Sequence, residues 1–117
     1  MKRYLLPMVV VLSLAGCDQS PKFDGSSKGA FLYSGEKIVA SLPDEKKAEL
    51  KQATSDILRY AHVVTSVDIG SGREAEKEAD NMYLKIMDGK TVDEVIAESK
   101  RLKEKTEQKI AEATSKH

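Results

Sequence analysis

The chain has 117 residues, which suffice for one compact domain. Nineteen Lys and Arg residues balance nineteen Asp and Glu residues, so the formal net charge is zero. A neutral chain lacks the strongly basic surface that binds nucleic acid non-specifically, and we therefore expect no nucleic-acid partner. The single cysteine excludes an internal disulfide bond.

The first residues have the three parts of a secretory signal. Lys2 and Arg3 give a cationic start, an apolar run of ten residues extends from Leu5 to Leu14, and two small residues follow. The run is shorter than the roughly 20 apolar residues that a membrane-spanning helix needs. We therefore expect residues 1–16 to be removed as a signal peptide.

The sequence Leu14-Ala15-Gly16-Cys17 resembles the lipobox of bacterial lipoproteins. The resemblance implies cleavage between Gly16 and Cys17, a diacylglyceryl group on the cysteine sulfur, and acylation of the new amine, for example with palmitate. One acyl chain binds a membrane only marginally, whereas two or more anchor a protein stably. The lipid bilayer is thus an expected partner, through acylated Cys17. The alternative is an uncleaved apolar helix in which the cysteine is incidental.

Asp18 and Gln19 follow the cysteine and resemble the sorting signal that retains enterobacterial lipoproteins in the inner membrane. The resemblance implies a lipid-anchored protein on the periplasmic side of the inner membrane. Residues 17–27 are rich in Ser, Gly, Pro and Asp, which predicts that the lipidated cysteine is followed by a flexible tether.

Four amphipathic segments predict an all-α bundle of three or four helices over residues 28–102. The first is expected at about 28–41 with an N-cap at Asp24, Ser26 or Ser27, although an extended piece at 30–33 is an alternative. The second begins near Pro43 and ends at the glycine-rich stretch 68–72. Its apolar stripe recurs at three- and four-residue steps, at Leu50, Ala53, Ile57, Ala61 and Val64.

The third helix is expected at about 73–88, where Gly89 stops it. The fourth starts at a T-x-x-E capping box, Thr91 to Glu94. Residues 103–117 alternate Lys and Glu, which predicts a solvated or fraying polar helix or tail. Coiled-coil pairing through this helix is disfavoured, because Ser and Thr occupy two of its five seam-like positions, Val92, Val95, Ser99, Leu102 and Thr106.

A second resemblance covers most of residues 24–103. Asp24-Gly-Ser-Ser, then Phe31 and Ser34, and above all Asp88-Gly-Lys-Thr-Val-Asp-Glu-Val-Ile-Ala-Glu-Ser99 are similar to an uncharacterised family of small bacterial lipoproteins. The family pattern usually has Ala at position 99 and Ser at position 43, and neither departure threatens a helical structure. The resemblance implies fold and location, and no activity.

Motifs for catalysis are weak. Gly89-Lys90-Thr91 resembles the end of a P-loop, but Leu84 stands where that motif needs its first glycine, so capping explains the triplet better. His62 has no histidine four residues away, which disfavours a zinc pair. Ser66, Asp68 and His62 lack the G-x-S-x-G elbow of a hydrolase. The carboxylates alternate with lysines and predict a solvated face.

We therefore expect a non-enzymatic binding or interaction module in the bacterial cell envelope, with an envelope protein as its partner. No cofactor and no metal is expected. The alternatives are an immunity-type lipoprotein that neutralises a toxin, a small envelope hydrolase, and a spacer lipoprotein. A deep pocket with two converging titratable groups would favour the hydrolase, and a long helix past Leu102 with oligomeric packing would favour the spacer.

Overall fold

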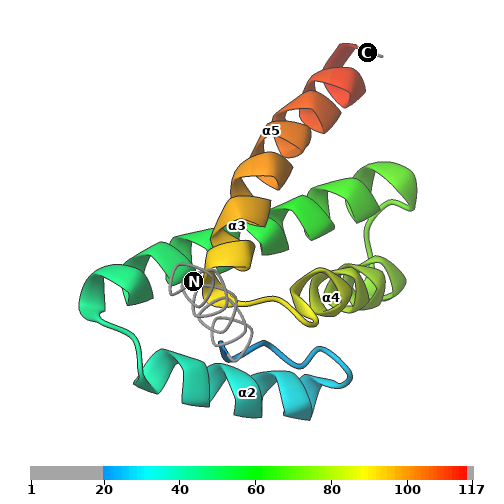
Figure 1. Cartoon of the computed structure of the whole chain (residues 1–117). Helices are drawn as coiled ribbons and strands as arrows, with labels where there is room; N and C mark the ends of the chain where they lie inside the picture. The colour runs from blue at the N-terminus through cyan, green and yellow to red at the C-terminus, as the bar shows by residue number, and fades with distance from the viewer. Residues whose placement is uncertain (1–19, 116–117) are drawn as a thin grey trace, which may run out of the picture.

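The computed structural model describes residues 20–115 and contains in that range four helices and no strand (Figure 1). The helices are α2 (Lys28–Ala40), α3 (Asp44–Asp68), α4 (Arg73–Met87) and α5 (Val92–Ser115). The predicted all-α bundle is confirmed. None of these helices has the length and apolar character that a membrane span requires.

Local signals set the helix starts. The Ser27 hydroxyl accepts a hydrogen bond from the Ala30 amide at 3.1 Å and caps α2, so the extended alternative for residues 30–33 is wrong. At the start of α5 the Thr91 hydroxyl accepts from the Glu94 amide at 3.3 Å, and the Glu94 carboxylate accepts from the Thr91 amide at 2.9 Å. The predicted capping box is confirmed.

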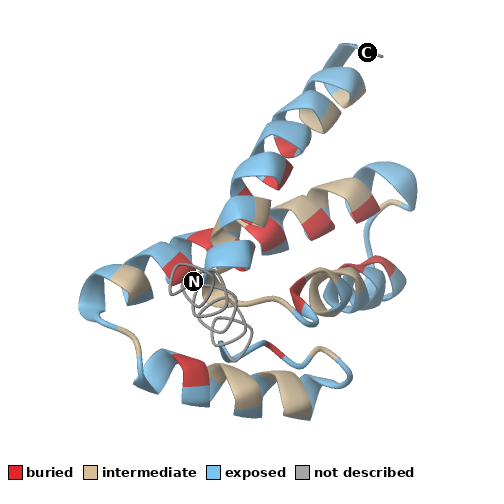
Figure 2. Ribbon diagram, viewed as in Figure 1, coloured by how far each residue is buried: buried red, intermediate tan, exposed pale blue. Residues whose placement is uncertain are grey.

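The core lies where α3 packs against α5 and α4, and all three helices carry buried residues (Figure 2). The predicted stripe of α3 is buried except at its last position, where Val64 is only partly buried and Thr65 takes its place. The seam-like positions of α5 pack within the chain against α3. The buried residues of the two helices are Leu50, Ala53, Ile57, Ala61 and Thr65 on α3, and Val95, Ser99, Leu102 and Thr106 on α5.

Hydroxyl side chains fit this seam because each bonds to a carbonyl of its own helix. Thr65 donates to Ala61 O, Ser99 donates to Ile96 O at 2.7 Å, and Thr106 donates to Leu102 O at 2.8 Å. A satisfied hydroxyl avoids the cost of burying an unpaired polar group. The seam therefore extends past Leu102, and α5 continues to Ser115 in the part of the chain predicted to be a solvated helix or tail.

Three ion pairs connect α3 and α5 in order along both helices. Lys46 pairs with Asp93 at 3.1 Å, Arg59 with Glu107 at 3.8 Å, and Asp68 with Lys109 at 3.3 Å. The order shows that the two helices run in the same direction, with α4 as the return connection. Exposed pairs of this kind contribute at most about 1 kcal/mol each, so they add little to the stability of the domain.

The segment before α2 is packed onto the bundle, which shortens the predicted tether. Phe23 is buried, its amide donates to Lys90 O at 2.9 Å, and its carbonyl accepts from the Gly89 amide at 2.8 Å. The Gly25 amide donates to an Asp88 carboxylate oxygen at 2.8 Å. We call these contacts the clasp. The ordered domain thus begins before residue 28, because an aromatic side chain within the polar segment enters the core.

Candidate functional site

Helix α2 packs less closely on the bundle than the other helices. Ile38 is its one buried residue, and aromatic rings support the rest of it. Phe31 lies 5.7 Å from Phe23 and 5.4 Å from Tyr83, measured between ring centroids, the second pair in an edge-to-face arrangement. The rings of Phe23 and Tyr83 contact α2 along one side of the helix, at Phe31. Two spaces remain, one on each side of this contact.

The first space is an apolar groove of about 680 Å³ between α2 and α3. Along α2 it extends from Phe31 to Ala40, and Phe23 forms part of its wall. The α3 wall carries two lysines, and the α2 wall carries one glutamate. The lining residues are Phe23, Phe31, Leu32, Gly35, Glu36, Val39, Ala40, Lys47, Leu50, Lys51 and Thr54.

The second space is a hollow of about 520 Å³ on the other side of α2, against α3 and α4. Phe31 and Leu32 line both spaces, and Leu32 is 59% exposed, so it forms a ridge between them. We call the groove, this hollow and the ridge together the α2 surface. The hollow is lined by Ser26, Ser27, Lys28, Phe31, Leu32, Leu58, Lys77, Asp80, Asn81, Tyr83 and Leu84.

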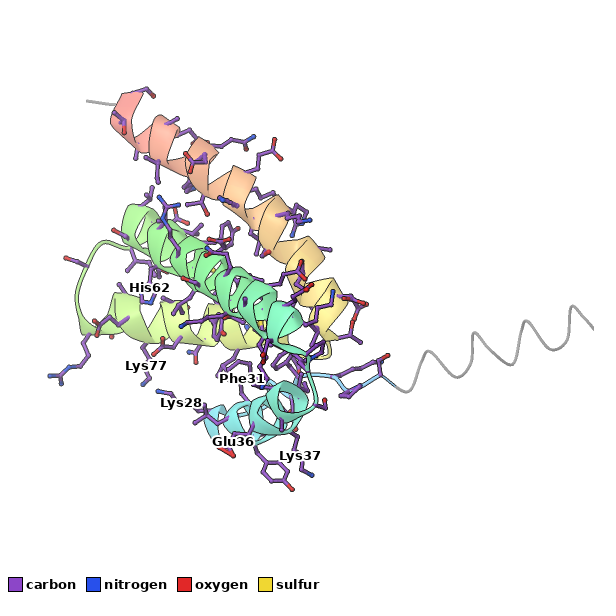
Figure 3. The ribbon with its side chains drawn as sticks, turned by 90° about the vertical axis from the view of Figure 1, so that its left-hand side faces the viewer. Lys28, Phe31, Glu36, Lys37, His62 and Lys77 are labelled. Carbon is purple, nitrogen blue, oxygen red and sulfur yellow. The ribbon has the colours of Figure 1, made fainter. Side chains whose placement is uncertain are left out.

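Charged side chains around the α2 surface are not paired within the part of the chain that the structure describes. The groove is bordered by Glu36, Lys47 and Lys51, and the hollow by Lys28, Lys77 and Asp80, and none of the six forms an ion pair. Lys28 on α2 and Lys77 on α4 lie on the same side of the molecule (Figure 3). Four lysines against two carboxylates make this rim positive.

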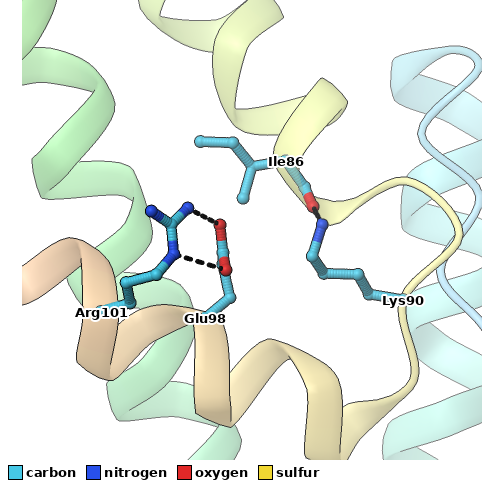
Figure 4. Close-up of polar contacts among 4 residues, drawn as sticks. All are labelled: Ile86, Lys90, Glu98 and Arg101. Carbon is cyan, nitrogen blue, oxygen red and sulfur yellow. Dashed lines mark hydrogen bonds and ion pairs between the residues drawn. The ribbon is translucent and has the colours of Figure 1, made fainter.

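The polar groups of residues 88–91 form hydrogen bonds with other parts of the chain. Asp88 and Gly89 form the clasp, and the Lys90 amine donates to Ile86 O at the end of α4 (Figure 4). The Thr91 hydroxyl caps α5. These groups are thus taken up by the chain itself, in agreement with the interpretation of the triplet as a cap.

The residues of the possible hydrolase triad are not brought together. His62 and Ser66 line a small hollow of about 230 Å³ near the α3–α4 connection. Asp68 instead pairs with Lys109 of α5 at 3.3 Å. Among residues 20–115 there is no group of three or more His, Cys, Asp and Glu side chains that could hold a metal ion.

The glutamates with shifted pKa values favour the ionised form. Two hydrogen bonds from Arg101, at 3.2 and 2.6 Å, lower the pKa of the Glu98 carboxyl (Figure 4). The hydrogen bond from the Thr91 backbone amide lowers the pKa of Glu94. A general acid needs a raised pKa, so the lowered pKa values of these two carboxyls fit structural roles in a helix cap and an ion pair.

The predicted lipidation and sorting residues, Gly16, Cys17, Asp18 and Gln19, lie outside the described residues. The α2 surface is a site that the sequence analysis did not find. Its one available signal was that α2 carries apolar residues on two faces: Phe31 and Ile38 point to the core, while Leu32 and Val39 stay exposed at 59% and 38%.

Four helices without a strand in residues 20–115 define a small all-α bundle protein with an exposed apolar surface on one side. The chain belongs to a family of unknown function (DUF6694), whose sequence model matches residues 3–104. The matched range includes Cys17 and the whole of the 88–99 signature. Searches of the curated proteins and of the solved structures gave no significant match to this chain.

Proposed function

We propose that the chain is a lipid-anchored, non-enzymatic binding module that holds an envelope protein through its α2 surface. The observation that carries the binding role is the α2 surface itself. Leu32 is 59% exposed between a groove of about 680 Å³ and a hollow of about 520 Å³. Contiguous exposed apolar surface on a small protein is typical of a site that contacts another molecule.

Membrane anchoring at Cys17 is supported by the lipobox pattern of the sequence. Five residues lie between Cys17 and Phe23, so Phe23, which is fixed in the core, is six positions along the chain from Cys17. A chain of six residues spans at most about 21 Å. Phe23 also lines the groove, so an anchor at Cys17 keeps the α2 surface within a short distance of the bilayer. We therefore expect the partner to reside at the periplasmic face of the inner membrane.

Replacement of the lipidated residue tests the anchor. Cells that express the full chain should incorporate labelled palmitate into it and retain it in the membrane fraction, and Cys17→Ser should abolish both. A Cys17→Ser product that is still processed and still sediments with membranes would contradict lipid anchoring.

A matched pair of variants tests the binding role. Leu32→Asp places a charge on the ridge, whereas Ile69→Asp places one at an apolar residue that is 57% exposed and lies outside the α2 surface. When the full chain is purified from detergent-solubilised membranes, we expect a co-purifying envelope protein to be lost with Leu32→Asp and kept with Ile69→Asp. Equal retention by the two variants, or no retained protein with any variant, would contradict the proposal.

A further inference from the structure

We infer that the α2 surface binds an amphipathic helix whose apolar face is flanked by acidic residues, on an envelope protein. The inference rests on the proposed function and names the chemistry of the partner. It follows from the shape of the groove, from the exposure of its ridge, and from the charge of its rim.

The groove has the dimensions of a helix site. It follows α2 from Phe31 to Ala40, and ten helical residues extend about 15 Å. A helix that presents anchors at positions i, i+3 or i+4, and i+7 covers about 10 Å with them. Two to three turns of a partner helix therefore fit alongside α2, with α3 as the opposite wall.

The exposure of the ridge favours a macromolecule over a small apolar ligand. Small ligands are held in concave sites that cover most of their surface. Leu32, in contrast, is 59% exposed and Val39 38% exposed, so apolar side chains stand at the edge of the groove as well as within it. A partner that lies over the ridge reaches both the groove and the hollow, and it removes Leu32 and Val39 from water together.

The rim supplies the charge preference. Lys47 and Lys51 stand one turn apart on the α3 wall, and Lys28 and Lys77 border the hollow. Glu36 and Asp80 are the two acidic residues on this rim, so it carries two net positive charges. The chain after residue 16 has 17 basic and 19 acidic residues, so the positive rim stands out on a mildly negative protein. Complementary charge selects an acidic partner and speeds its encounter.

Site-specific photocrosslinking in intact cells tests this inference with the full chain. The photoreactive residue p-benzoylphenylalanine is introduced in place of Leu32, in place of Val39, and, as a control, in place of the exposed Ile69. We expect a discrete protein adduct at positions 32 and 39 and none at position 69. Mass spectrometry of the adduct should map the crosslink to a segment with apolar residues three or four positions apart and Asp or Glu beside them.

Charge reversal provides the second arm. Lys47→Glu combined with Lys51→Glu should lower the adduct yield by about tenfold, because repulsion replaces attraction at the rim. Lys100→Glu combined with Lys103→Glu makes the same change of charge at exposed positions of α5 and should leave the yield unchanged. Equal yields from the two double variants would overturn the inference.

The outcomes separate the inference from the proposed function. An adduct at position 32 with a protein segment that lacks acidic residues overturns the inference and leaves the binding role intact. An adduct with phospholipid alone, an adduct with a second copy of the chain, or no adduct overturns both.

Discussion

The two sides of α3 are packed in different ways. Towards α5 and α4 the helix presents a stripe of small and branched side chains, and Ile57 and Ala61 in it have no exposed surface. Towards α2 it meets a helix held by Phe23, Phe31 and Ile38, with space on both sides. The difference indicates that the stability of the domain is concentrated in the packing of α3 against α5 and α4, while the apolar residues around α2 remain available for contact.

The largest expected effect is on the free energy of unfolding, which should fall for a substitution in the core and stay nearly unchanged for one on the α2 surface. Ile57→Ala removes a fully buried side chain of α3 from the core and should lower the free energy of unfolding by about 2–5 kcal/mol. Leu32→Ala removes a side chain that is 59% exposed and should change it by no more than about 0.5 kcal/mol. Chemical denaturation of the full chain measures both. Similar losses for the two variants would show that α2 is part of the stabilising core.

The clasp gives the next largest effect, because it has room for no side chain at Gly25. A Cβ atom there would lie 2.2 Å from the carbonyl oxygen of Leu84 and 2.8 Å from the Cβ of Asp88. Gly25→Ala should therefore open the clasp and lower the free energy of unfolding by about 1–3 kcal/mol. Faster hydrogen exchange at the Phe23 and Gly89 amides should accompany the loss.

Gly29→Ala is the matched control for this variant. Gly29 lies in α2, and a Cβ atom there would have no neighbour within 4 Å. Alanine is favoured over glycine inside a helix by about 1 kcal/mol, so the control should raise stability. A loss of stability with Gly29→Ala, or no loss with Gly25→Ala, would contradict the described packing of the N-terminal segment.

Local signals made much of the fold predictable. The capping box at Thr91 and Glu94 lies within four consecutive residues, and the stripe on α3 repeats at helical spacing, so both appear in a short window of sequence. The clasp joins Gly25 to Asp88 across 63 positions, and no local pattern reports such a pairing. The polar neighbours of Phe23 predict a tether at this position, although the Phe23 ring is buried.

The seam shows a second limit of sequence patterns. Ser99 and Thr106 count against a coiled coil when they are scored as polar residues. In the structure their hydroxyls bond to carbonyls of α5, and both side chains are buried. The α2 surface was missed for a related reason, since Leu32 and Val39 fit an amphipathic helix equally well whether a neighbour covers them or not.

The smallest expected effect is a pH dependence at the start of α5. The Thr91 amide holds the pKa of Glu94 below its ordinary value of 4.5, so the folded state binds this proton less readily than the unfolded state. The stabilisation from ionised Glu94 is therefore complete above the unfolded pKa and is lost as the pH falls through the folded pKa. Glu94→Gln should lower Tm at pH 7, and the difference from the unmodified chain should shrink as the pH falls below the ordinary carboxyl pKa of 4.5. Glu104→Gln, at an exposed position of α5 without these hydrogen bonds, is the matched control and should leave Tm at pH 7 unchanged. If the Tm difference between Glu94→Gln and the unmodified chain stays constant with pH, the carboxylate acts by packing. The contacts of α5 with α3 would then account for the stability of this helix without its charged cap.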